Sequence, residues 1–172
     1  DGTPAEIPGG GRGVDVNGDG RIEAYEGCVN PSNGAPLRDC LRQTALDLSQ
    51  LVRAIRAGID LDGDGTVDLD GSRIYYAGQS LGSLYGTIFN AIEPETVAAV
   101  LNVGGGSVVE IARWSQSFQA LASAVLGSAV NDNYVFPYRP AKVNDVPGAI
   151  DLQNLLELYE WAGMPGDPLA FA

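Results

Sequence analysis

The apolar side chains of this chain follow two patterns, one helical and one extended. Between residues 37 and 59 they recur every three or four positions, which predicts an amphipathic helix that ends near Gly58. Residues 73–77 are β-branched and aromatic, and residues 97–103 form an apolar run, so both predict buried strands, the second of them fully buried. Residues 83–92 have helical character. The order helix, strand, turn, helix, strand indicates an α/β fold with a parallel sheet.

The pattern changes after residue 106. Residues 108–126 and 150–161 predict two apolar helices, and a turn-rich connection with three prolines, residues 131–147, lies between them. Two interpretations stay open: the helices form an inserted cap, or they are ordinary helices that cover the sheet. The predicted organisation is therefore an insertion over residues 1–36, an α/β core segment over 37–106 and a helical cap region over 107–172.

The charge of the chain is unevenly distributed. The formal net charge is −12, from 22 acidic and 10 basic residues, which argues against a nucleic-acid partner because phosphates require lysine and arginine. No run approaches the roughly 20 apolar residues of a membrane span. Nine of the acidic residues fall in two short segments, residues 15–26 and 60–70. Carboxylates packed this densely call for a cation. The alternative is a solvated acidic loop, but the internal spacing argues against it.

The first acidic segment fits the calcium loop of an EF-hand at every ligand position. Gly20 supplies the sharp turn at position 6, and Ile22 is the apolar eighth residue. A chance match rarely satisfies all of these positions. The expected ligands are Asp15, Asn17, Asp19, the Arg21 carbonyl, Glu23 and the bidentate Glu26.

The second acidic segment repeats this pattern through position 9, but Gly71 occupies position 12, where the bidentate glutamate should be. Asp70 at position 11, or water, is the expected replacement. Because this loop joins the first helix to the first strand, we expect a structural role for calcium, which would neutralise the carboxylates and fix the entry of the strand. The expected ligands are Asp60, Asp62, Asp64, Thr66, Asp68 and Asp70.

Residues 78–82, Gly-Gln-Ser-Leu-Gly, match the Gly-x-Ser-x-Gly nucleophile motif. In that motif a serine on a sharp strand-to-helix turn projects its hydroxyl above the sheet, and the glycines leave room for backbones that pass close by. The amide that follows the serine points at a developing oxyanion. The motif alone also occurs by chance in ordinary turns, but here a strand pattern precedes it and a helix pattern follows.

Three runs, residues 38–44, 59–65 and 72–82, together resemble bacterial α/β-hydrolases of the virulence-factor lipase and lysophospholipase type. The likeness is closest over residues 38–106. It implies a partial α/β-hydrolase sheet with a helical cap, Ser80 as the nucleophile and the Leu81 amide as one oxyanion donor. It also implies an exported or surface-attached bacterial enzyme that acts on lipid or short acyl esters.

The chain departs from this family in one decisive respect, because it contains no histidine. The family supplies an acid and then a histidine after the serine, and a serine hydroxyl without a base is a poor nucleophile. We therefore expect an internal segment of a larger hydrolase, whose remaining part supplies the base. None of the later aspartates follows an evident strand, so the acid stays unassigned among Asp132, Asp145, Asp151 and Asp167.

Two alternatives to an active hydrolase stay open. The paired acidic loops are also typical of calcium-stabilised interaction modules such as dockerins, although a strand pattern follows the second loop where a helix would be required. The missing histidine is compatible with a catalytically dead hydrolase homologue.

The chain has two cysteines, Cys28 and Cys40, without metal or redox spacing. We favour a disulfide between them over two free thiols. A disulfide fits a secreted, periplasmic or cell-surface protein.

Overall fold

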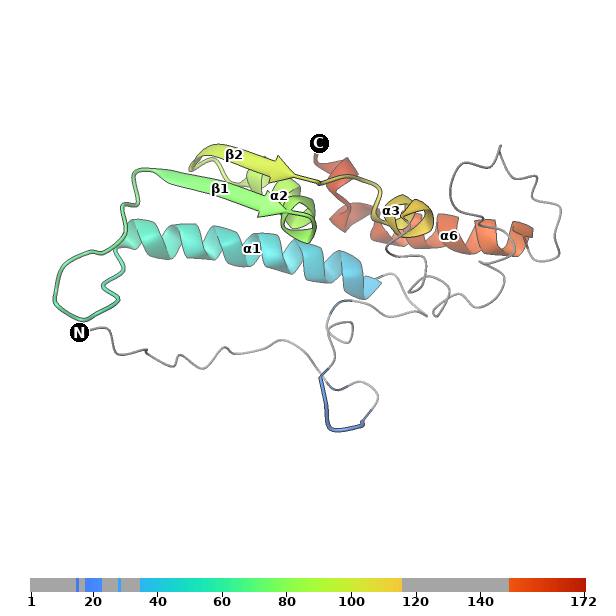
Figure 1. Cartoon of the computed structure of the whole chain (residues 1–172), viewed down its shortest axis with the longest axis horizontal. Helices are drawn as coiled ribbons and strands as arrows, with labels where there is room; N and C mark the ends of the chain where they lie inside the picture. Colours follow the sequence, from blue (N-terminus) through green and yellow to red (C-terminus); the bar gives the residue numbers. More distant parts are fainter. Residues whose placement is uncertain (1–14, 16–17, 23–27, 29–34, 116–148) are drawn as a thin grey trace.

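The computed structural model describes residues 15, 18–22, 28, 35–115 and 149–172 (Figure 1). In this part of the chain the fold is mixed α/β, with helices packed against a two-stranded parallel sheet. The predicted order of the first five elements is confirmed. None of the described helices is both long and apolar enough to cross a membrane.

Helix α1, Ala35–Ala57, forms where the three- and four-residue apolar steps predict it. Its inward face contains Leu41, Ala45 and Val52, all of which are buried. Gly58 follows with a φ of 95°, and its amide donates to the Ile55 carbonyl at 3.1 Å. A left-handed glycine is the usual way to end a helix, because other residues are strained there.

Strand β1, Ile74–Gln79, helix α2, Leu81–Ile92, and strand β2, Thr96–Asn102, follow one another directly. The sequence predicted a five-residue turn over 78–82. The structure instead continues the strand to Gln79 and begins the helix at Leu81, so that Ser80 alone makes the turn. The two strands pair in parallel, with Gln79 opposite Asn102 at their carboxyl ends.

The hydrophobic core lies on one face of the sheet. Two side chains of β1, Ile74 and Tyr76, face this core and pack against its buried residues. Figure 1 shows α1 and α2 on the same side of the strands. The buried core residues of the two helices are Leu41, Ala45, Val52, Ile88 and Phe89.

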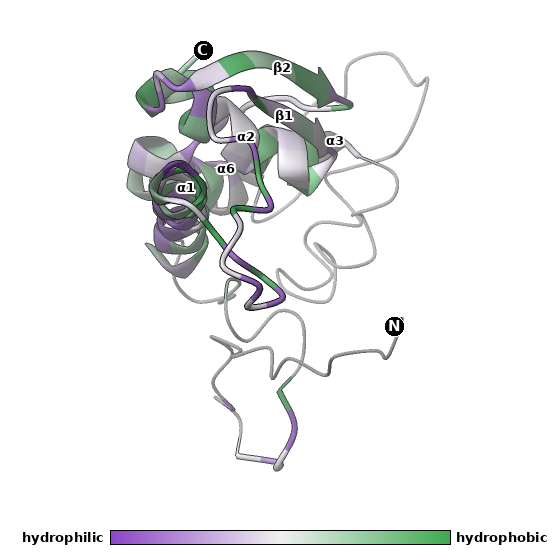
Figure 2. Cartoon of the chain, turned by 90° about the vertical axis from the view of Figure 1, so that its left-hand side faces the viewer, coloured by the Kyte–Doolittle hydropathy of each residue, from purple (hydrophilic) through white to green (hydrophobic). Residues whose placement is uncertain are grey.

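The prediction that residues 97–103 are fully buried is wrong. Val97 is 59% exposed and Val100 66% exposed, and every β2 residue after Thr96 is exposed. Figure 2 shows hydrophobic stretches along β2. The apolar composition of β2 is typical of a parallel strand covered on both faces and paired on both edges. In the described residues β2 pairs only with β1, so these neighbours are missing.

The C-terminal elements pack near the first turns of α1 and α3. Helix α3, Val108–Trp114, begins as predicted but ends earlier than predicted, because Ser115 is extended with a ψ of 124°. The rest of the expected helix, residues 116–126, lies outside the described residues. Helix α6, Ala149–Gly163, matches the helix predicted over 150–161. The short 3-10 helices η2, Met164–Gly166, and η3, Pro168–Ala170, end the chain. A Cβ at Gly166 would lie 2.8 Å from the Cα of Arg38, so this contact with α1 requires glycine.

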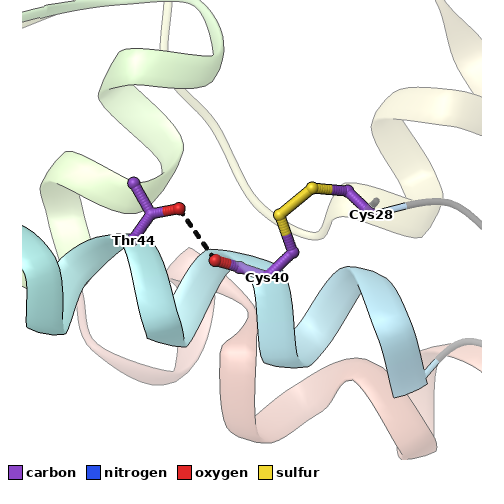
Figure 3. The surroundings of a disulfide bond; sticks show 3 residues. All are labelled: Cys28, Cys40 and Thr44. Carbon is purple, nitrogen blue, oxygen red and sulfur yellow. Dashed lines mark hydrogen bonds between the residues drawn. A yellow bond between two sulfur atoms is a disulfide. The ribbon is translucent and has the colours of Figure 1, made fainter. Parts of the chain in front are cut away.

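The predicted disulfide between Cys28 and Cys40 is present and joins the N-terminal segment to the first turns of α1 (Figure 3). The two Cα atoms are 5.3 Å apart. Four residues further along α1, the Thr44 hydroxyl donates to the Cys40 carbonyl at 2.8 Å.

Candidate functional site

Ser80 has a backbone conformation that non-glycine residues rarely adopt. Its φ is 52° and its ψ is −116°, and it lies between the last residue of β1 and the first residue of α2. Such a conformation costs about 1–3 kcal/mol and persists only where the surrounding structure fixes it. The residue is exposed, so its hydroxyl is accessible at the carboxyl end of the sheet.

Hydrogen bonds hold the backbone of Ser80 on both sides. Its amide donates to the carbonyl of Asn102, the last residue of β2, at 3.0 Å. Its carbonyl accepts from the amides of Ser83 at 2.8 Å and Leu84 at 3.2 Å in α2. Ser80 is therefore tied to β2 and to α2 at once.

The two glycines of the motif have different roles. A Cβ at Gly78 would lie 2.6 Å from the carbonyl carbon of Gly82 and 2.9 Å from Cε1 of Tyr76, which is too close for any side chain. A Cβ at Gly82 would meet nothing nearer than the Tyr85 hydroxyl at 3.6 Å. The sequence interpretation, that both glycines make room for close backbones, therefore applies to Gly78, which packs against the main chain of Gly82.

Tyr76 supports the same turn, a role that the sequence analysis missed. Its hydroxyl donates to the Gly82 carbonyl, and its ring lies 5.2 Å from that of Phe89. A Cβ at Gly86 would lie 2.8 Å from Cζ of Tyr76, so the ring fills the space above this glycine. Burial, and then the neighbouring Tyr85, raise the pKa of Tyr76. The available signal was Gly86, a glycine inside a predicted helix.

Leu81 is the first residue of α2, and its side chain is 54% exposed. Amides in the first turn of a helix have no acceptor within the helix, and the helix dipole gives this end a partial positive charge. The Leu81 N–H lies in this first turn, directly after the hydroxyl-bearing residue.

Of the four aspartates considered for the catalytic acid, the structure describes two. Asp167 is buried, and its carboxylate accepts from the amides of Val108 at 2.6 Å and Leu169 at 2.9 Å. These bonds anchor η3 to the start of α3, so the role of Asp167 in this structure is to join two segments. Asp151 is exposed in the first turn of α6. Asp132 and Asp145 lie outside the described residues.

The first acidic loop is described in part: Asn17, Glu23 and Glu26 lie outside the described residues. The carboxylate of Asp15 accepts from the amides of Gly18 at 2.6 Å, Asp19 at 3.2 Å and Gly20 at 2.8 Å. The carboxylate of Asp19 in turn accepts from the Arg21 amide at 2.9 Å.

The second acidic loop repeats these bonds at the same positions. The carboxylate of Asp60 accepts from the amides of Gly63 at 2.7 Å, Asp64 at 3.2 Å and Gly65 at 2.8 Å. These bonds lower the pKa of Asp60, and the bond from the Gly65 amide has the largest effect. The carboxylate of Asp64 accepts from the Thr66 amide at 2.7 Å. The described part of the first loop therefore folds like the corresponding part of the second, although the two are far apart in the sequence.

Three of the six expected ligands in this loop come together. Asp60, Asp62 and Asp68 each have a carboxylate oxygen within 4.8 Å of the others. Asp70 is engaged elsewhere, because Ser72 donates to it through its amide and hydroxyl and Arg73 through Nε at 2.8 Å. These partners lower the pKa of Asp70 to about 2, and the Ser72 hydroxyl has the largest effect. The structure does not place Asp70 with the other carboxylates.

Comparison of the chain with family models, with curated proteins and with solved structures finds no match.

Proposed function

We propose that this chain carries the nucleophile of a serine carboxylic-ester hydrolase, a lipase or esterase, with Ser80 as the attacking residue. The observation that carries the proposal is the left-handed backbone of Ser80 at a one-residue junction between a parallel strand and a helix. A strained, exposed serine at such a junction fits a hydroxyl presented to a substrate.

The proposed reaction has two steps. The Ser80 oxygen adds to the ester carbonyl while a base removes its proton, and the Leu81 N–H stabilises the negative oxygen that forms. The C–O bond to the alcohol breaks, the alcohol leaves with a proton, and an acyl-serine remains. Water then adds to the acyl carbonyl in the same way, which releases the acid and restores the hydroxyl.

This reaction needs a base, and the chain contains no histidine that could serve as one. We place it, together with the acid, in the remaining part of a larger hydrolase. The exposed apolar side chains of β2 support this assignment, since Val97 and Val100 require covering elements. Within the described residues, both outer edges of the parallel strand pair are unpaired, which also calls for further strands. The substrate proposed is a lipid or short acyl ester.

A fluorophosphonate, which phosphonylates activated serines, tests this function on the natural full-length protein. We expect labelling at Ser80, no labelling in Ser80→Ala and unchanged labelling in Ser72→Ala, a control serine just after the second acidic loop. A folded full-length protein that stays unlabelled would contradict the proposal and favour a catalytically dead homologue.

We also propose that the acidic loops bind calcium in a structural role. The specific observation is the hydrogen-bond pattern that the two loops share, in which an aspartate at position 1 accepts three successive amides. The cluster of Asp60, Asp62 and Asp68 supplies the oxygen ligands that calcium prefers. The disulfide and these loops together suit a secreted, periplasmic or cell-surface protein.

Thermal unfolding with calcium and with a chelator tests this second proposal. Calcium at 100 times its Kd should stabilise the fold by about 2.7 kcal/mol. Asp60→Asn should reduce this stabilisation, whereas Glu157→Gln, which removes an exposed charge on α6, should not. Identical unfolding curves with and without calcium would exclude a structural metal. Calcium-dependent binding of a partner protein without esterase activity would favour a non-catalytic interaction module.

A further inference from the structure

Ser83 is the most deeply buried side chain among the described residues, although it is polar. Its exposed fraction is 0%, and it lies in the first turn of α2. Its hydroxyl oxygen is 2.8 Å from the Gly78 carbonyl and 2.7 Å from the Asn102 carbonyl. One hydroxyl hydrogen serves two carbonyls, which belong to the carboxyl-terminal halves of the two strands.

These contacts close a ring of hydrogen bonds around Ser80. The Asn102 carbonyl accepts from the Ser83 hydroxyl and also from the Ser80 amide at 3.0 Å. The Ser83 amide donates to the Ser80 carbonyl at 2.8 Å. The Ser80 carbonyl therefore accepts from Ser83 directly. The Ser80 amide donates to a carbonyl that also accepts from the Ser83 hydroxyl.

The space around Ser83 admits only a small side chain. A Cβ at Gly104 would lie 2.9 Å from the Ser83 Cβ, so the segment that follows β2 passes directly over this serine. Val103, which directly precedes Gly104, has a φ of 51°, which is strained for a β-branched residue. Two strained residues, Ser80 and Val103, therefore follow the paired ends of β1 and β2, and Ser83 contacts the segments on both sides.

We propose that Ser83 is a positioning residue for Ser80, an inference that rests on the proposed hydrolase function. By holding the ends of both strands against the first turn of α2, its hydroxyl maintains the left-handed conformation of Ser80. It thereby fixes the nucleophilic oxygen relative to the Leu81 amide. Effects of this kind are large because small displacements of reacting groups reduce rates steeply.

The test compares fluorophosphonate labelling rates in the full-length protein. Ser83→Ala should reduce the second-order rate constant for labelling of Ser80 at least tenfold at a temperature well below unfolding. Thr87→Val removes a hydroxyl of the same helix that donates to the Ser83 carbonyl at 2.9 Å, and should change the rate less than twofold. Val52→Ala destabilises the core on α1 and should also leave the rate within twofold.

A second readout does not depend on activity. In Ser83→Ala the Ser80 amide, which donates to Asn102, should exchange with solvent at least tenfold faster. If Ser83→Ala does not fold, Gly104→Ala, which presses on the Ser83 Cβ, should slow labelling in the same direction.

The outcomes separate the two proposals. A wild-type protein that is never labelled overturns the hydrolase function, and faster exchange in Ser83→Ala would then identify a purely structural hydroxyl. A wild-type protein that is labelled, with Ser83→Ala within twofold of it, overturns the positioning role alone. Equal rate losses in Ser83→Ala and Val52→Ala would likewise assign Ser83 to stability and overturn the positioning role.

Discussion

The turn at Ser80 and the second acidic loop both contain closely spaced glycines, but the glycines act in opposite ways. Gly78 is required for space, since a side chain there would meet the backbone of Gly82, whereas the left-handed residue of the turn is Ser80 itself. Gly63 and Gly65 have open space around them, and their φ angles of 78° and 87° are what require glycine.

This difference indicates what holds each region. The Ser80 turn is held by close packing and by bonds to two neighbouring elements, so its conformation needs no ligand. The acidic loop is held by carboxylates that accept its own amides, and those carboxylates repel one another. Its conformation should therefore respond to cations and to acid, whereas the turn should respond most to changes in side-chain volume.

The largest expected effect is that of Gly78→Ala. The added Cβ would overlap the Gly82 backbone, and overpacking of this kind costs about 3 kcal/mol. We expect chemical denaturation to show this loss in the free energy of unfolding, and fluorophosphonate labelling of Ser80 to disappear. Gly82→Ala, two residues after Ser80, is the matched control. It has space for its Cβ and a favourable helix propensity, so it should be neutral or stabilising by up to about 1 kcal/mol. Equal losses in both variants would contradict the packing argument.

In the acidic loop the corresponding change, Gly65→Ala, should cost less. Nothing lies within 4 Å of the new Cβ, so the cost is only that of an alanine at a φ of 87°, about 1–2 kcal/mol. Calcium titration by calorimetry should show weaker binding, because the Gly65 amide holds Asp60 in place. Ser80 labelling should not change. A loss of labelling would show that the two regions are coupled, and would contradict the expectation that the loop and the turn are held independently.

The sequence predicted those features that depend on local pattern. The helix over α1 follows from its apolar stripe, and the strand, turn and helix around Ser80 follow from a short motif with suitable flanks. The sequence did not predict that the turn is a single residue, because that depends on how tightly Gly78 packs against Gly82. It also missed Ser83, since a serine in a helix carries no pattern that distinguishes a buried bridge from a surface hydroxyl.

The error about β2 has a different cause. Its composition specifies which surroundings the strand requires, namely cover on both faces and a partner on each edge. It does not specify where those surroundings come from. The exposed side chains of Val97 and Val100 are thus consistent with the predicted strand, and the prediction failed only on burial.

Tyr76→Phe should produce a smaller loss on the Ser80 side. The variant keeps the ring that packs on Gly86 and Phe89 but removes the hydroxyl that donates to the Gly82 carbonyl. The loss of one such hydrogen bond costs about 1 kcal/mol. Thermal denaturation should detect this change without a calcium dependence. Tyr75→Phe, on the exposed face of β1, is the control and should change stability by less than 0.5 kcal/mol, roughly the range of surface substitutions. A larger loss in Tyr75→Phe than in Tyr76→Phe would contradict the role assigned to the Tyr76 hydroxyl.

The smallest expected effects come from changes in pH. Acid should affect the acidic loop, and alkali should affect the turn at Ser80. In the calcium-free loop, the folded pKa values of Asp60 and Asp70 are lowered from 3.8. Their contribution to stability is therefore complete above pH 4 and is lost as the pH falls, toward about 2 for Asp70. At the Ser80 turn, the folded pKa of Tyr76 is raised from 10.0 by burial, so its contribution is complete below pH 10 and is lost as the pH rises through the higher folded value. The phenolate cannot donate to Gly82.

Amide NMR spectra recorded across this range test that contrast residue by residue. Acid should shift the Gly63 and Gly65 amides while the Ser80 and Ser83 amides stay unchanged, because the first pair donates to a carboxylate and the second pair donates to backbone carbonyls. Alkali should do the reverse, and Tyr76→Phe should abolish the alkaline change at the turn. If acid moved both sets of amides together, the loop and the turn would form one cooperative unit. The calcium proposed for the loop would then act directly on the geometry of Ser80.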